Sequence, residues 1–233
     1  QEFETYQFLQ KQLKACDKQI NQFIKAYIKT NPHLKKLKLE PKPYKRENKN
    51  APQIKNFNQV AYQYFGGVDL LAIEGMSHST VLSIMAEIGL DGFKKFKSSK
   101  AFVSWLRLAP NNKISGGKVL SSKIPKGSNR LKIALRQAAN AIGNLKDTHL
   151  SDFFKRVAFR KGRQAAVSAT ARKLGVIIWN MITNQQPYNP PTQYLFLDQK
   201  RKLGLVKRIK KQMDKFDIKP EEVGFVNPSF SMT

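Results

Sequence analysis

The chain of 233 residues has few acids, one cysteine and no long apolar run, and each of these shortages excludes a class of partner or site. Only 16 Asp and Glu stand against 42 Lys and Arg, and the formal net charge of +26 favours a polyanionic partner such as nucleic acid. The single cysteine, Cys16, excludes an internal disulfide framework and a cysteine zinc site. That cysteine count fits a reducing, cytoplasmic setting best. Because no apolar run approaches transmembrane length, we expect no membrane partner.

The acids are also unevenly distributed along the chain. None occurs between Gly92 and Lys146, although that stretch carries thirteen Lys or Arg. At its middle lies a polar loop, residues 111–118, in which Ser115 is followed by two glycines. Since phosphates relieve the self-repulsion of such a segment, Ser115 is expected to lie where a phosphodiester binds.

Attack by a serine hydroxyl on a phosphodiester has two chemical requirements. A base or a metal must help to remove the proton, and donors must surround the phosphate oxygens. Gly116 and Gly117 allow close backbone approach, and a glycine turn at Gly75 is a second candidate for presenting amides to phosphate. The cationic candidates are Lys113, Lys118, Lys123, Lys126, Arg130 and Arg136.

The base is missing from this stretch, which has no Asp, Glu or His. The three histidines, His33, His78 and His149, are far apart and lack metal-ligand spacing, so we expect no metal or other cofactor bound by this chain. If Ser115 is a nucleophile, its activation comes from elsewhere in the fold or from residues outside this sequence.

The N-terminal residues predict a long helix over 2–30, which Asn31-Pro32 ends. Its apolar residues alternate spacings of three and four, which is typical of a coiled coil. Two interpretations remain open: a helix packed on its own domain, or an arm that pairs with another chain. The seam consists of Tyr6, Leu9, Leu13, Cys16, Ile20, Phe23 and Tyr27.

The rest of the pattern predicts an all-α fold, with one small hairpin around Gly116-Gly117. We divide the chain into a coiled-coil arm (1–31), a basic Pro-, Lys- and Asn-rich linker (32–56), a compact helical domain (57–188) and a basic tail (189–233) with a possible helix near 199–216. Residues 70–77 and 80–89 predict two short helices around a glycine turn, a helix-hairpin-helix-like element. Gly127-Ser128 is expected to open a helix that runs to about Ile142.

The order of several short elements resembles a known family. They are Ile73-Glu74-Gly75, Ala86-Glu87-Ile88-Gly89, Leu106-Arg107-Leu108-Ala109-Pro110, Ser115-Gly116-Gly117-Lys118, Gly127-Ser128, Ala134-Leu135-Arg136-Gln137-Ala138-Ala139 and Ala171-Arg172-Lys173-Leu174. Over roughly residues 65–188 the chain resembles the C-terminal domain of the insertion-sequence transposases of the one-ten/one-sixteen group, relatives of the Piv DNA invertase. Two positions depart from that pattern: Ser77 replaces a hairpin glycine, and Ser128 stands where an asparagine usually follows Gly127.

The resemblance implies a function. It makes Ser115 the catalytic nucleophile of a recombinase that cuts and rejoins DNA through a serine–DNA phosphodiester, guided by a structured noncoding bridge RNA. It also implies a bacterial or archaeal, nucleoid-associated protein, and a magnesium-binding nuclease-like domain that precedes this sequence. On that basis we expect this chain to be inactive alone and to form a homo-oligomer through its N-terminal helix. The alternatives are a non-enzymatic DNA- or RNA-binding helix-hairpin-helix module and an RNA-packaging protein.

Overall fold

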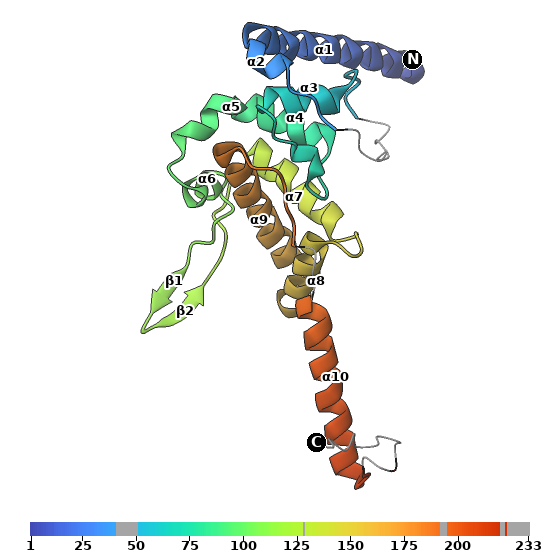
Figure 1. Ribbon diagram of the computed structural model, residues 1–233, viewed down its shortest axis with the longest axis vertical. Helices are drawn as coiled ribbons and strands as arrows, with labels where there is room; N and C mark the ends of the chain where they lie inside the picture. The colour runs from blue at the N-terminus through green and yellow to red at the C-terminus, as the bar shows by residue number, and fades with distance from the viewer. Residues whose placement is uncertain (41–50, 128, 192–194, 220–221, 223–233) are drawn as a thin grey trace, which may run out of the picture. The chain divides into compact units, whose positions relative to one another are not determined.

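The computed structural model describes residues 1–40, 51–127, 129–191, 195–219 and 222, with the backbone alone at 195–201. The expected all-α class is confirmed, because a single two-stranded pair is the only sheet in these residues (Figure 1). The α-helices are α1 (Glu2–Thr30), α2 (Pro32–Lys35), α3 (Phe57–Tyr64), α4 (His78–Glu87), α5 (Gly89–Gly92), α6 (Ser99–Trp105), α7 (Arg130–Ile142), α8 (His149–Lys161), α9 (Arg163–Asn184) and α10 (Leu195–Phe216). The 3₁₀ turns η1 (Leu70–Ala72) and η2 (Phe93–Lys95) and the strands β1 (Lys113–Ser115) and β2 (Lys118–Ser121) complete the elements.

The chain forms two units, Gln1–Pro190 and a second that begins at Pro191. The second unit contains α10, which covers the helix expected near 199–216 and begins four residues earlier. Along its described side chains α10 exposes both lysines and apolar residues, among them Leu203 and Leu205. The candidate site lies in the first unit.

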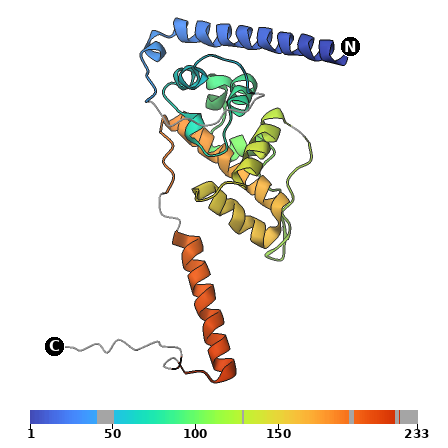
Figure 2. The ribbon, with the colours of Figure 1, turned by 90° about the vertical axis from the view of Figure 1, so that its right-hand side faces the viewer.

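The core of the first unit is built around α9, which contacts α6, α7 and α8 (Figure 2). Its inward face is made of small and apolar residues, so neighbouring helices approach closely. A Cβ added at Gly175 would lie 3.1 Å from Val103 Cγ1, which shows how near α6 comes to α9. The buried α9 residues are Ala166, Val167, Thr170, Ala171, Leu174, Gly175, Ile178, Met181 and Ile182.

The long N-terminal helix has two different ends. Near its C-terminus Ile24 and Ile28 are buried with Leu34 and Val60, and Asn31 caps the helix before Pro32 opens α2. Toward its N-terminus the predicted seam is exposed, and Leu13 keeps 57% of its surface accessible. The last turns therefore pack on the unit, as the first interpretation expects, and the earlier turns bear an uncovered apolar stripe. Pairing of that stripe with another chain stays a prediction.

The segment before α3 is partly tied to it. Gln59 on α3 accepts a hydrogen bond from the Leu39 amide (2.9 Å) and donates to the Leu37 carbonyl (2.7 Å). Ile54 and Phe57 are buried in the core. The predicted linker therefore has ordered contacts at both ends, and its middle, residues 41–50, lies outside the described residues.

The helix-hairpin-helix-like element differs from its prediction. Its first arm is a single 3₁₀ turn, Leu70–Ala72, and not an α-helix, because the Asp69 carboxylate caps the Leu71 and Ala72 amides and the chain then extends at Ile73. The second arm, α4, begins at His78. Ser77 is its N-cap, with its hydroxyl accepting from the Thr80 amide. The serine that departs from the family pattern thus starts a helix.

The cap of α7 also differs from expectation. Its N-cap is Asn129, whose side-chain oxygen accepts from the Leu131 and Lys132 amides, and the helix begins at Arg130. Ser128, the predicted cap, lies outside the described residues. An asparagine provides this oxygen as well as a serine does. The predicted start of the helix was therefore within two residues of the observed one, and the predicted cap was one position too early.

Candidate nucleic-acid interface

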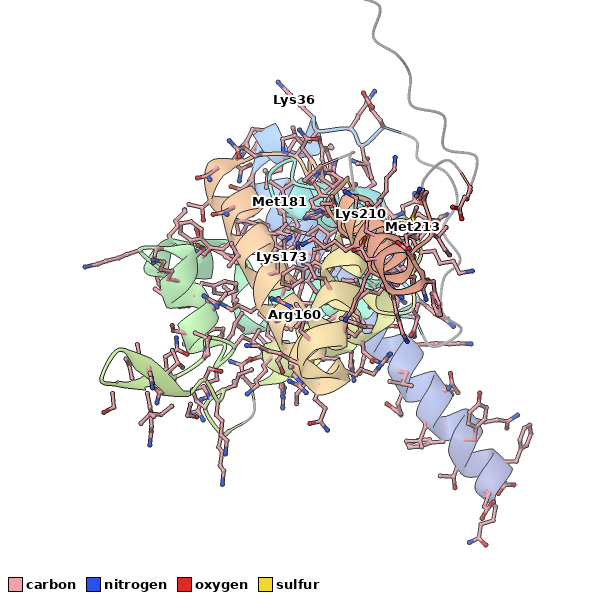
Figure 3. All side chains as sticks on the ribbon, turned by 90° about the horizontal axis from the view of Figure 1, so that it is seen from below. Lys36, Arg160, Lys173, Met181, Lys210 and Met213 are labelled. Atoms are coloured by element: carbon pink, nitrogen blue, oxygen red, sulfur yellow. The ribbon has the colours of Figure 1, made fainter. Side chains whose placement is uncertain are left out.

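Ser115 lies at the end of β1, in a hairpin that projects from the helices of its unit (Figures 1 and 3). β1 and β2 are antiparallel, with Ser115 opposite Lys118 and Ile114 opposite Val119. Residues opposite each other share a face, and neighbours along a strand alternate. One face of the hairpin therefore carries the Ser115 hydroxyl beside the Lys118 ammonium, and the other carries Ile114 and Val119.

The turn of the hairpin is made by Gly116 and Gly117, with φ of +54° and +72°. A two-residue turn with both φ values positive suits the twist of the strands, and glycine adopts it without steric cost. A Cβ at either position would meet nothing within 4 Å, so these glycines are needed for conformation and not for packing. The predicted hairpin is confirmed.

The hairpin side chains are open to solvent. Lys113, Ser115 and Lys118 are exposed, as are the apolar Ile114 (63%) and Leu120 (70%). Ser115 is therefore presented outward, where a strand of nucleic acid can reach it, and is not part of the hydrophobic core.

The base of the hairpin is held by hydrogen bonds to carbonyl groups. The Asn111 amide donates to the Lys123 carbonyl (2.9 Å), and Arg107 Nη1 donates to the Lys126 carbonyl (2.7 Å). From α7, Lys132 Nζ donates to the Gly127 carbonyl (3.1 Å). The Lys123 and Lys126 side chains are exposed beside this base, so their ammonium groups extend the positive surface of the hairpin.

The remaining candidates lie on helices or pack against them. Arg130 opens α7 and is 3.9 Å from the Glu87 carboxylate, while Arg136 Nη1 donates to the Ser168 hydroxyl on α9 (2.5 Å). Gly75 packs against α7: a Cβ there would lie 2.5 Å from Ile142 Cγ1. Close packing and a φ of +74° explain that glycine without a phosphate.

Sequence reasoning missed Arg107 and Lys132, which both contact the turn at 125–127. Burial and the positive charges of Arg136 and Arg107 lower the pKa of Lys132. The signal available in the sequence was an arginine two residues after the end of α6, where a helix often ends on a glycine.

A second polar cluster joins distant parts of the first unit. Lys173 Nζ on α9 (Figure 3) lies 2.7 Å from His149 Nε2 at the start of α8, and the Tyr188 hydroxyl donates to the Glu74 carboxylate. Burial lowers the pKa of both Lys173 and His149; Arg156 adds to the effect on the lysine and Lys173 to that on the histidine. The cluster ties Tyr188 of the segment after α9 to the turn before α4.

The residues present do not form a magnesium site. Across the described residues, no group of three or more His, Cys, Asp or Glu is placed to hold a metal ion. His78 bonds Asn58 and His149 bonds Lys173, so each has a partner away from the hairpin. In the same residues no helix is long and apolar enough to span a membrane.

Comparison with known proteins covers the centre of this unit. No curated protein and no solved structure is significantly similar to the chain. One family model does match. The matched residues include the hairpin, α6 and α7 but neither α1 nor α9, and they are fewer than residues 65–188, over which the sequence resembles the family. Residues 69–155 match the transposase family described as IS116/IS110/IS902, and this match supports a DNA transposase or recombinase role with DNA as the partner.

Proposed function

We propose that this chain is the serine-bearing part of an RNA-guided DNA transposase, and that Ser115 is its nucleophile. The observation that carries the proposal is the exposed position of Ser115 beside Lys118, on a basic hairpin inside the matched residues 69–155. A hydroxyl so placed meets a DNA phosphate without any rearrangement of the core.

In the proposed step, Ser115 Oγ attacks a backbone phosphorus. An oxygen–phosphorus bond forms to the serine, the bond from phosphorus to one sugar oxygen breaks, and that oxygen takes up a proton to become a free hydroxyl end. In this proposal the Lys118 ammonium, opposite Ser115 in the hairpin, and the amides of the Gly116-Gly117 turn stabilise the charge that develops on the phosphate oxygens. Reversal with a second DNA end rejoins the strands and restores the serine.

Removal of the serine proton is assigned to a group outside the hairpin. The stretch 92–146 has no acid or histidine, and the described residues form no metal site. We therefore propose that a magnesium-holding, nuclease-like domain in another part of the protein or in a partner activates the serine, and that this chain does not cleave DNA alone.

The test is trapping of a covalent protein–DNA adduct in the complete protein. Ser115→Ala is expected to abolish the adduct, because no other hydroxyl shares the face of Lys118 at the turn. Ser122→Ala is the matched control: this serine is also exposed and lies just after β2, and its loss should leave the adduct intact. An adduct that persists in Ser115→Ala refutes the assignment.

The second candidate is a non-enzymatic nucleic-acid-binding module. The absence of an acid–base partner from the stretch around Ser115 favours it. It predicts that Ser115→Ala changes DNA affinity less than twofold and that no adduct forms with any companion domain, whereas the enzymatic proposal predicts unchanged affinity and loss of the adduct.

A structured guide RNA is part of the proposal. The excess of 42 cations over 16 acids allows many phosphate contacts, to RNA as well as to DNA. Under such a mechanism base pairing selects the DNA sites, and the protein binds backbones. Copurification of a discrete noncoding RNA with the complete protein, lost after ribonuclease treatment together with site selection, tests this part.

For the exposed part of α1 we propose pairing with a second copy of the chain. Tyr6, Leu9 and Leu13 form a stripe at coiled-coil spacing, and each is more than half exposed. The stripe leads to an apolar pocket of about 510 Å³ between α1, α3 and α4, lined in part by Phe23 and Leu82. A second α1 covers such a stripe with identical residues.

A further inference from the structure

The backbone of Arg107 is unusual. Its φ is +54°, and it follows α6 at the position where a left-handed residue ends a helix: its amide donates to Ser104 and the Leu108 amide to Val103. Glycine is favoured there. The other non-glycine residues of positive φ in the described part of the chain are Asn, Asp or Gln, so Arg107 is the one cation in this conformation there.

The side chain of Arg107 crosses Gly127. Its Nη1 donates to the Lys126 carbonyl at 2.7 Å, and a Cβ on Gly127 would lie 1.8 Å from the same nitrogen. A side chain at Gly127 would displace the guanidinium from this carbonyl. The helix end after α6 and the glycine before α7 therefore act together to place one positive charge at the base of the hairpin.

A second cation, Lys132 on α7, lies against the same turn: its Nζ donates to the Gly127 and Pro125 carbonyls. Arg136 follows Lys132 one helical turn later on α7, so the two side chains are neighbours on the helix surface. The charges of Arg136 and Arg107 both lower the pKa of Lys132. Lys132 and Arg136 are half-buried. Carbonyl and hydroxyl partners satisfy some donors but neutralise no charge, and no carboxylate of the described residues contributes to the pKa shift of Lys132.

Cations held this close together repel one another, and a bound anion relieves that repulsion. Residues 92–146 provide none, and a guanidinium offers five N–H donors whose planar arrangement matches phosphate oxygens. We infer that Arg107, Lys132 and Arg136 form a binding site for one phosphate of a DNA backbone at the base of the hairpin. The inference rests on the proposed function, and in it these residues are positioning residues: they fix the hairpin on the strand that Ser115 meets.

The experiment measures binding of the full chain to a fluorescent DNA duplex by anisotropy over a range of sodium chloride concentrations. Arg107→Gly removes the charge but keeps the left-handed backbone, so thermal melting should not fall. Lys132→Gln is the second variant. In each we expect about tenfold weaker binding at low salt. The slope of log affinity against log salt should fall in each variant, by at most about 0.9, the value for complete loss of one phosphate contact.

Lys155→Gln is the matched control. Lys155 is an exposed cation on α8 that also donates to a carbonyl, that of Leu145 at 3.0 Å, and its loss should leave the slope unchanged. Wild-type slopes in both Arg107→Gly and Lys132→Gln overturn the site while the proposed function stands. A wild-type chain that does not bind DNA overturns both.

Two further arms identify the source of the phosphate. In the first, inorganic phosphate is added and the melting temperature is measured. If phosphate raises the melting temperature of the wild type but not that of Arg107→Gly, and the salt slopes for DNA are the same in both, the site binds a free anion and the DNA assignment is overturned. The DNA assignment is also overturned if the Arg107→Gly and Lys132→Gln variants bind an RNA duplex of equal length more weakly than the wild type does but bind DNA as the wild type does.

Discussion

Gly75 and Gly116 share a left-handed backbone, with φ of +74° and +54°, but their surroundings differ. Gly75 lies against α7, where a Cβ would come within 2.8 Å of the Ala138 carbonyl oxygen, while Gly116 has open space around it. At the residue scale, glycine is needed in the first case for both conformation and contact and in the second for conformation alone.

Gly75→Ala should therefore destabilise the protein by about 2–4 kcal/mol, from overpacking and left-handed strain together. Gly116→Ala should cost about 1 kcal/mol within the hairpin and leave the global unfolding transition nearly unchanged. Urea denaturation of both variants checks this, and equal effects of the two changes would contradict it.

His149 provides a pH-dependent contribution to stability. Burial, and then the charge of Lys173, lower its pKa in the folded state; Glu74 and Asp152 act in the opposite direction and Arg156 in the same one. Because the unfolded chain binds the proton more tightly, the contribution is complete above the ordinary value of about 6.5 and is lost as the pH falls through that value toward the lower folded pKa.

Acidification from neutral pH should thus lower the urea midpoint of the wild type more than that of His149→Gln. The pKa of Lys173 is also lowered, but from an alkaline value, so its effect belongs to a higher pH window. The exposed His33→Gln is the control and should keep the wild-type response. If the urea midpoints of the wild type, His149→Gln and His33→Gln fall equally on acidification, His149 does not contribute to the pH dependence of stability.

At the scale of elements, α1 is divided between two roles by burial. Ile24 and Ile28 pack with Val60 and hold the last turns to the unit, while Leu9 and Leu13 remain exposed. The periodicity described the stripe correctly, but the residues that dock on the unit lie one position beside it.

Leu9→Glu with Leu13→Glu should therefore convert a dimer into a monomer without lowering the melting temperature of the fold, because paired carboxylates disrupt a coiled-coil seam. Ile28→Ala should instead lower stability by about 2–4 kcal/mol through lost burial. Sedimentation and thermal melting separate the two effects. A wild-type chain that sediments as a monomer would rule out pairing through α1.

At the scale of the whole molecule, the dominant property is a net charge of +26. DNA binding should accordingly weaken steeply with salt. For about six phosphate contacts, affinity should fall about a thousandfold between low and near-physiological salt, since each contact releases condensed counterions. Anisotropy titrations measure the slope, and a shallow slope would show that few of these cations meet phosphates.

Helical periodicity, turn residues and composition are local properties, so the all-α class, the extent of α1, the Gly116-Gly117 hairpin and the charge could all be predicted from the sequence. It also pointed to Ser115, since a Ser-Gly-Gly turn in an acid-free stretch is visible along the chain. It could not show that Leu70–Ala72 is only a 3₁₀ turn, because the cap at Asp69 competes with a helical pattern.

Which cations lie close together follows from the tertiary structure and not from the sequence pattern. Arg107 and Lys132 are 25 residues apart, and they meet because the end of α6 and the start of α7 both contact the turn at 125–127. The tertiary structure likewise showed that Gly75 packs against α7, while its phosphate contact stays a prediction. Such meetings depend on how helices cross in space, and crossing is set by side-chain packing over the whole core and not by any local pattern.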